Sequence, residues 1–292
     1  MPLSAPKPDY EYLVPLRTSG SGPPLFCFPG LGGNVFIFRE MVAALRGGIS
    51  VYGVDLEWLC ESRQHFTVEQ VAEFCLDVIR TRQKCGPYYF CGYSFGGLVA
   101  YEMAKELSTC DHGAGLVALL DTPNPALIKT LSQAASARFR KTYVIDRLKK
   151  YTLHLLRGEL KSLTSRGLAF VTSRAGQFFM PAIKNAFQIV NRPLPDVLKS
   201  NDPGFHAAWH SYVPSSYDQD IICFRVEERG PEHADDPSMG WEACVRGKVH
   251  VHVVSGSHVD MMSAPAVVEI SERLAGYLDR HATHKEDTTC CK

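Results

Sequence analysis

A serine between two glycines constrains the fold of this chain more than any other feature. The stretch Gly92 to Gly96, with Ser94 at its centre, separates the apolar run 88–91 from the helix-like run 98–107. A serine at such a strand-to-helix junction is typical of a nucleophile elbow. The turn is tight, so side chains two residues before or after the serine would collide with the next helix and a neighbouring strand. Alone, the pattern is weak, because it also occurs by chance on surface loops.

Two further reactive side chains follow strand-like runs. Asp121 closes the apolar run 116–120, and His258 lies in a glycine-bounded loop just after the run 249–254. A neutral serine needs an imidazole to take its proton and a carboxylate to hold that imidazole in the right tautomer. Because sites gather at the carboxyl edge of an open parallel sheet, Ser94, Asp121 and His258 are predicted to form a catalytic triad. The alternatives are an aspartate that caps a turn and a histidine in an ordinary loop.

Strand-like and helix-like segments alternate through the first part of the chain. Strands are expected at 24–28, 50–54, 88–91 and 115–120, and helices at 36–45, 68–82 and 98–107. Thr67 is a plausible N-cap of the second helix. This alternation, with the order Ser, Asp, His, predicts an α/β-hydrolase fold, which has a mostly parallel central sheet and helices on both faces.

A glycine-rich loop after the strand at 24–28 is the candidate oxyanion hole. It runs from Pro29 to Asn34 and leads into the helix expected at 36–45. In this fold one backbone N–H comes from such a loop and the other from the residue after the nucleophile. The candidates are therefore Leu31 and Phe95. A phosphate-binding loop does not fit, because the stretch has neither the Lys-Ser/Thr of a P-loop nor G-x-G-x-x-G spacing.

After Asp121 the alternation stops, and the chain is predicted to insert a helical lid. The expected organisation is an N-terminal linker or edge segment (1–22), a first core part (23–125), a basic lid insertion (126–204), a second core part (205–281) and a polar tail (282–292). Residues 126–200 carry fourteen Lys and Arg against three Asp and Glu, although the whole chain is neutral. These charges either solvate the outer faces of helices or attract an acidic partner. Nucleic acid is a weaker choice, because no nucleic-acid motif occurs.

Length and composition fit one globular hydrolase domain. The chain has 292 residues, of which 45% are hydrophobic and 21% charged, and these are globular values. No apolar run is long enough to span a bilayer and no signal peptide is recognised, so a cytoplasmic location without an integral membrane segment is expected. The ten cysteines are interpreted as reduced thiols. No metal site is expected, because His250 and His252 lie two apart on one strand face.

Several blocks of the chain together resemble the terminal thioesterase domains of nonribosomal peptide synthetases and polyketide synthases. They are LVPLR (13–17), PLFCFPG (24–30), YSFGG (93–97), LLDTP (119–123) and GSH (256–258). The resemblance runs from about Tyr12 to Leu278. It implies that Ser94 is the acylated nucleophile, Asp121 the acid and His258 the base. Pro29-Gly30-Leu31 departs from the usual start of the oxyanion loop, which leaves Leu31 the less secure of the two amide candidates.

The predicted function is that of a thioesterase with an acyl-serine intermediate. It would release an acyl, polyketide or peptidyl chain from the phosphopantetheine thioester of a carrier protein, by hydrolysis or cyclisation. No cofactor of its own is expected, and an acidic carrier protein docking on the basic lid is the expected partner. The alternatives are a carboxylesterase or lipase, a trans-acting editing thioesterase with the same triad, and a binding protein with a vestigial site. Lid aromatics such as Phe139 and Phe178 are expected either to line an acyl channel or to form the lid's own core.

Overall fold

The structure is a computed structural model of the chain, and it describes residues 3, 11–20, 22–62, 65–108, 113–126, 203–227, 236–258 and 260–283. Contacts divide the chain into two units, residues 1–130 with 204–292, and residues 131–203. Nearly all of the predicted lid, with its aromatic and basic side chains, lies outside the described residues. The same holds for the predicted tail beyond residue 283.

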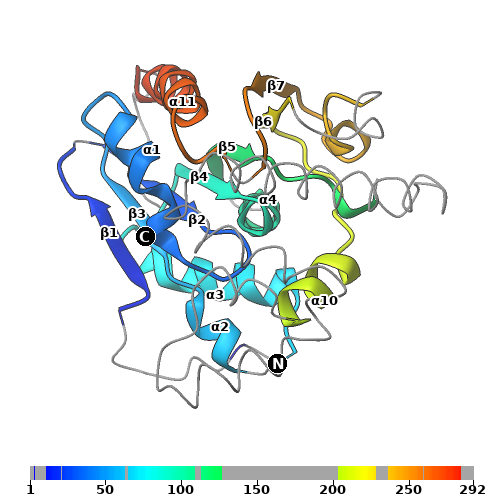
Figure 1. Cartoon of the computed structure of the whole chain (residues 1–292). Helices are drawn as coiled ribbons and strands as arrows, with labels where there is room; N and C mark the ends of the chain where they lie inside the picture. Colours follow the sequence, from blue (N-terminus) through cyan, green and yellow to red (C-terminus); the bar gives the residue numbers. More distant parts are fainter. Residues whose placement is uncertain are drawn as a thin grey trace, which may run out of the picture. The chain divides into compact units, whose positions relative to one another are not determined.

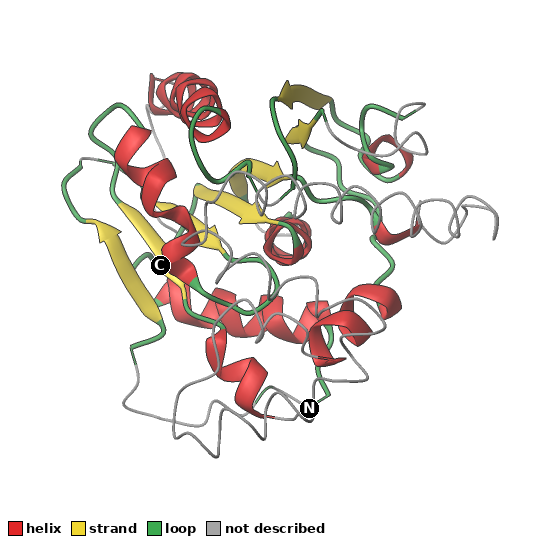
Figure 2. Cartoon of the chain, in the orientation of Figure 1, coloured by secondary structure: helices red, strands yellow, loops and turns green. Residues whose placement is uncertain are grey.

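A sheet of seven strands forms the centre of the described residues (Figures 1 and 2). Its spatial order is β1-β3-β2-β4-β5-β6-β7. The pairs from β3 to β7 are all parallel, whereas β1 is antiparallel to β3. The strands are β1 (Leu13–Arg17), β2 (Leu25–Phe28), β3 (Val51–Val54), β4 (Tyr88–Tyr93), β5 (Ala114–Leu120), β6 (Ile221–Val226) and β7 (Val249–Val254).

Helices cover both faces of this sheet, because the central strands are apolar on both faces. One core combines alternate strand residues with α3 (Val68–Arg80), α4 (Phe95–Leu107) and α10 (Pro203–Ser211). The other core combines the remaining strand residues with α1 (Arg39–Ala44) and α11 (Ala266–Thr283). Figure 1 shows α1 and α11 on one side of the strands and α3 and α10 on the other. The expected mostly parallel sheet with helices on both faces is confirmed.

Helix α3 begins where the sequence predicts it. The Thr67 side chain accepts a hydrogen bond from the Gln70 N–H, and the Gln70 side chain accepts one from the Thr67 N–H. This reciprocal pair is a capping box, which satisfies two backbone donors that the first helical turn leaves without partners. The six buried side chains of α3 recur at helical spacing and face the sheet.

Other elements differ from the predicted ones. The helix expected at 36–45 is a 3-10 turn, η1 (Val35–Phe38), followed by α1. The Asn34 side chain accepts a hydrogen bond from the Phe36 N–H at 2.8 Å and so caps the first turn of η1. The helix expected at 98–107 begins three residues earlier, at Phe95, and three helices, α2 (Glu57–Ser62), α10 and the eighteen-residue α11, were not predicted. The six residues of α2 and the nine of α10 are too few for a clear helical period.

The cysteines follow the expectation with one exception. Six of them, Cys27, Cys60, Cys75, Cys91, Cys223 and Cys244, are free thiols. Burial raises the pKa of the Cys75 and Cys223 thiols, which keeps them protonated and inert. Cys85 is disulfide-bonded, so the interpretation as a reduced thiol is wrong for that residue. A cysteine in an irregular loop after a helix gives no periodic signal that it will pair.

Candidate active site

Ser94 occupies a strained turn between β4 and α4. Its φ is +53°, in the left-handed region that residues with side chains rarely adopt. A Cβ on Gly92 would lie 2.2 Å from the carbonyl oxygen of Gly96, and one on Gly96 would lie 2.0 Å from that of Phe28. The collisions predicted from the sequence, with the following helix and with a neighbouring strand, are therefore confirmed. Strain of this kind persists only where the surrounding structure fixes it, and it is typical of functional sites.

Backbone contacts join the serine to the end of β5. The Ser94 N–H donates to the Leu120 carbonyl at 2.9 Å, and the Thr122 hydroxyl donates to the Ser94 carbonyl at 3.0 Å. Asp121 lies between these two partners. The nucleophile candidate and the acid candidate are therefore fixed to the same edge of the sheet by main-chain geometry.

Asp121 is fully buried, and each oxygen of its carboxylate has a partner. One oxygen, Oδ1, accepts from the Val226 N–H at the end of β6 at 3.2 Å, and the other, Oδ2, lies 2.6 Å from His258 Nδ1. The Asp121 N–H donates to the Phe224 carbonyl at 2.7 Å. A buried carboxylate is costly unless it is hydrogen-bonded, and here both of its oxygens are satisfied. This arrangement keeps a proton on Nδ1 of His258 and leaves Nε2 as the basic atom.

His258 lies in the loop after β7, and its side chain is 41% exposed. The aspartate of that loop, Asp260, accepts a hydrogen bond from the Ser257 hydroxyl. The carboxylate hydrogen-bonded to the His258 ring is thus the one that the sequence predicts. Tyr93, which was not predicted as a site residue, stacks on the His258 ring with its centroid 5.0 Å away.

The structure brings two of the three predicted triad members into hydrogen-bond contact. Asp121 and His258 are joined, and Ser94 lies at the same edge of the sheet, directly after Tyr93. Within the described residues, which include both side chains, no hydrogen bond joins the Ser94 hydroxyl to the His258 ring. Catalytic hydrogen bonds are often long in the absence of substrate and tighten in the complex, and the proton transfer from Ser94 to His258 stays a prediction.

Of the two predicted oxyanion residues, Phe95 directly follows Ser94 and Leu31 follows a glycine that lies close to it. Phe95 is the first residue of α4, where an N–H has no partner inside the helix. Leu31 lies in a turn that the Gly33 N–H closes on the Gly30 carbonyl at 3.1 Å. A Cβ on Gly30 would lie 3.2 Å from the Ser94 Cβ, so this turn is in contact with the nucleophile's residue. The positions suit a pair of donors around an acyl oxygen, and the roles themselves stay predictions.

The segment after Asp121 is held by a second set of contacts that the sequence did not reveal. Trp241 Nε1 donates to the Thr122 carbonyl at 2.6 Å, and the Asn124 amide donates to the Gly240 carbonyl at 2.9 Å. The Asn124 N–H also donates to the Met239 carbonyl. These contacts fix the acid-bearing loop up to the point at which the predicted lid begins. A buried asparagine three residues after the acid is the one sequence signal for them.

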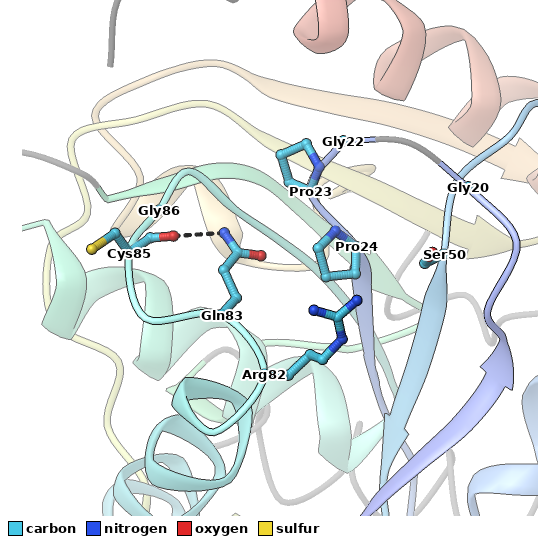
Figure 3. Close-up of a pocket in the computed structure, with 9 residues that line it drawn as sticks. All are labelled: Gly20, Gly22, Pro23, Pro24, Ser50, Arg82, Gln83, Cys85 and Gly86. Atoms are coloured by element: carbon cyan, nitrogen blue, oxygen red, sulfur yellow. Dashed lines mark hydrogen bonds between the residues drawn. The ribbon is translucent and has the colours of Figure 1, made fainter. Parts of the chain in front are cut away.

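A hollow in the described residues lies away from this site. It measures about 300 Å³ and is lined by Pro24, Ser50, Arg82, Gln83 and neighbouring residues (Figure 3). Pro24 and Ser50 directly precede β2 and β3, so the hollow is at the amino edge of the sheet, opposite the triad. It is therefore not the acyl-binding space of the predicted enzyme.

Among the described residues, no cluster of three or more His, Cys, Asp or Glu side chains has metal-binding geometry. The described helices include none that is long and apolar enough to cross a bilayer.

Known proteins with similar sequences are peptide synthetases and polyketide synthases. The chain is 30% identical over 294 residues to the probable nonribosomal peptide synthetase CymA of Salinispora arenicola, covering 95% of this chain and 4% of CymA. It is 28% identical to the malpinin synthetase of Mortierella alpina, over 91% of this chain and 3% of that protein. It is 25% identical to the non-reducing polyketide synthase crz7 of Cladonia metacorallifera, over 89% of this chain and 12% of that synthase. The chain thus spans only a small part of these relatives.

Solved structures share the fold. The NocB thioesterase domain matches with a TM-score of 0.61 and 18% identity, covering 92% of this chain and 99% of that one. The Vlm2 thioesterase domain bound with a dodecadepsipeptide matches with a TM-score of 0.59 and 24% identity, covering 92% and 97%. At these identities the matches establish the α/β-hydrolase fold.

The family match covers the region that carries both cores and the predicted triad. The family model for the thioesterase domain fits residues 23–275. The chain belongs to the thioesterase domain family, a class of serine hydrolases with the α/β-hydrolase fold.

Proposed function

We propose that this chain releases an acyl, polyketide or peptidyl group from the phosphopantetheine thioester of a carrier protein, with Ser94, His258 and Asp121 as the catalytic residues. The observation that carries the proposal is the 2.6 Å contact of His258 Nδ1 with the buried Asp121 carboxylate, at the sheet edge where the elbow presents Ser94. The family supports thioester chemistry, and its synthase relatives support a carrier as the acyl donor.

The first half-reaction acylates the serine. His258 Nε2 takes the proton of the Ser94 hydroxyl as its oxygen attacks the thioester carbonyl, and the new C–O bond gives a tetrahedral oxyanion. The backbone N–H groups of Phe95 and Leu31 donate to this oxyanion. Removing one donor of this kind costs about 3 kcal/mol of transition-state stabilisation. The oxyanion then collapses, the C–S bond breaks, and the leaving thiolate takes the proton from His258.

The second half-reaction removes the acyl group from Ser94. The neutral His258 takes a proton from the attacking group, and the ester bond to Ser94 breaks as the serine oxygen regains a proton. Water as the attacking group gives a free acid, whereas a hydroxyl or amine on the acyl chain gives a lactone or lactam. A dry site favours cyclisation, because it excludes the competing water.

The proposal includes an acidic carrier protein as the partner. Its docking surface would be the basic segment 126–200, where clustered positive charge accelerates encounter with negative surfaces. No cofactor belongs to the chain in this proposal, because the acyl group arrives on the partner's phosphopantetheine arm. We also propose a cytoplasmic location, which is supported by the free thiols of six of the seven described cysteines, Cys85 being the disulfide-bonded one.

An acylation assay separates this function from its alternatives. The protein is mixed with an acyl carrier protein bearing a thioester and, separately, with p-nitrophenyl esters, and intact mass spectrometry follows the acyl adduct on Ser94. We expect rapid acylation from the carrier and none in Ser94→Ala. Labelling by simple esters alone would indicate a carboxylesterase or lipase, and no labelling by any activated donor would indicate a binding protein.

The control for this assay is a serine outside the site. Ser108, at the end of α4, donates its hydroxyl to the Lys105 carbonyl. Ser108→Ala is expected to acylate at the wild-type rate. Loss of acylation in both serine variants would indicate damage to the helix instead of loss of the nucleophile.

A further inference from the structure

Tyr93 contacts His258 in two different ways. Its ring stacks on the imidazole with an interplanar angle of 19° and a centroid distance of 5.0 Å. Its hydroxyl donates a hydrogen bond to the His258 carbonyl oxygen at 2.7 Å. One side chain therefore touches both the ring and the main chain of the histidine, across 165 residues of sequence.

The same tyrosine contacts the candidate oxyanion loop. A Cβ on Gly30 would lie 3.1 Å from Cδ1 and 3.3 Å from Cε1 of Tyr93, so the tyrosine ring lies close against the backbone of that glycine. Tyr93 also directly precedes Ser94 in the elbow. Tyr93 thus contacts both the Gly30 turn and His258 while being covalently joined to the nucleophile.

We propose that Tyr93 is a positioning residue that holds the His258 ring in the plane required for proton transfer from Ser94. This inference rests on the proposed function, because it assigns the geometry of the same site. The hydrogen bond to Asp121 fixes one edge of the imidazole and leaves the ring able to turn about that contact. A flat partner on its face removes this freedom, and the bond to the His258 carbonyl fixes the loop that carries the ring.

The contact also favours the charged form that develops during the reaction. When His258 accepts the serine proton, the imidazole becomes an imidazolium. A cation over an aromatic face is attracted by the negative face of that ring. Tyr93 therefore acts more strongly in the transition state than before it, which predicts an effect on kcat and little effect on KM.

Two substitutions separate the two contacts. Tyr93→Phe removes the hydrogen bond and keeps the aromatic face, so the acylation rate should fall about fivefold. Tyr93→Leu removes both contacts, and the rate should fall about fifty-fold. KM for the acyl donor should stay within about twofold of the wild type in both variants, since the tyrosine acts on the histidine and does not bind the acyl group.

The strand provides a matched control. Tyr89 precedes Tyr93 by four residues on β4, so the two side chains lie on the same face, and the Tyr89 hydroxyl is buried with no hydrogen-bond partner among the described residues. Tyr89→Phe removes a hydroxyl from the same strand without touching His258. This variant should react at the wild-type rate and unfold no more easily than the wild type.

A fluorophosphonate probe and proton NMR complete the experiment. The probe reports the reactivity of Ser94 without a carrier, and the downfield Nδ1–H resonance of His258, identified by its loss in His258→Gln, reports the bond to Asp121. We expect the probe labelling and the resonance to be present in the wild type and in Tyr89→Phe, with the NMR signal broadened by exchange in Tyr93→Leu.

Wild-type probe reactivity and an unchanged resonance in Tyr93→Leu would overturn the inference. Absence of Ser94 labelling in the wild type would instead refute the proposed function, and the resonance would still decide the role of Tyr93. If Tyr93→Leu does not fold, the fivefold loss in Tyr93→Phe decides.

Discussion

The tight turn at Ser94 leaves no room for a Cβ atom at Gly96. The Cα of Gly96 lies so close to β2 that an added methyl group would overlap the Phe28 carbonyl. Gly96→Ala is therefore expected to lower the free energy of unfolding by about 3 kcal/mol, as overpacking in a core does. Urea unfolding followed by circular dichroism measures this change.

The control is a glycine with open space around it. Gly276 lies within α11, and nothing is within 4 Å of the position of its missing Cβ. Gly276→Ala should raise stability by about 1 kcal/mol, because alanine is the better helix former. Equal destabilisation by the two substitutions would contradict the steric account of the elbow.

The tautomer of His258 depends on its hydrogen bond with Asp121. In Asp121→Asn, the side-chain oxygen can still accept from the Val226 N–H, and the amide NH₂ then faces His258 Nδ1. The amide donates, so Nδ1 must accept, and the proton moves to Nε2, where it blocks the base. We expect the rate of Ser94 acylation to fall by about 10⁴ with unchanged circular dichroism. Near-normal turnover would assign the acid role to another carboxylate.

Site residues that belong to a recognisable sequence motif could be predicted, whereas a residue whose role depends on a contact made only in the folded chain could not. Ser94, Asp121 and His258 each follow an apolar run and carry reactive groups, so order and context point to them. Tyr93 has the same neighbours in the sequence, but its stacking on His258 depends on the path of a loop 165 residues away.

At the level of elements, α10 packs against the residue that follows the nucleophile. Phe205 in α10 is fully buried, and its ring meets Phe95 edge-on at 4.9 Å and Phe66 at 5.1 Å. Phe205→Ala should destabilise the protein by about 4 kcal/mol and slow acylation, because the Phe95 amide loses its support. Thermal unfolding and the acylation assay measure the two effects.

The control is Val213→Ala. Its side chain is 64% exposed, so this substitution should change stability by less than about 0.5 kcal/mol.

The pairing of β6 with β7 is sensitive to acid. The Lys248 N–H bonded to Asp220 lowers the pKa of that carboxyl, and the His250 ring beside it acts in the same direction. A lowered pKa in the folded state means that ionised Asp220 stabilises the fold above its ordinary pKa of about 3.9, and that this contribution disappears as the pH falls further. Asp220→Asn should therefore lower the midpoint of thermal unfolding more at pH 7 than at pH 3. An equal shift at both pH values would rule out the ionised carboxylate as the cause.

Element type was predicted correctly for the core strands and for α3, whereas α11 was missed although it is eighteen residues long. The core strands were placed within two residues of their observed ends, because strands buried on both faces are continuously apolar. The capping box of α3 was visible as Thr67. The first predicted helical run divides into η1 and α1, and the Asn34 hydrogen bond that caps η1 is not revealed by any periodicity.

The neutral total charge of the whole molecule conceals an uneven distribution. Since residues 126–200 carry a net charge of +11, the rest of the chain carries the balancing negative charge. If the basic segment receives an acidic carrier, raising the salt concentration from about 50 to about 500 mM should slow acylation by the carrier, because mobile ions screen long-range attraction. Acylation by p-nitrophenyl acetate should not change. Equal salt sensitivity for both donors would show that the basic charges only solvate the protein.

The contacts of Asp121 have a consequence for how proteins of this architecture diversify. Its carboxylate and its N–H are bound by the backbone of β6, at Val226 and Phe224, and main-chain groups are indifferent to side-chain replacement. These contacts lie outside the stretch between residues 126 and 203. Exchanging that stretch is therefore expected to leave them in place, so that substrate preference could change while the acid keeps its backbone partners.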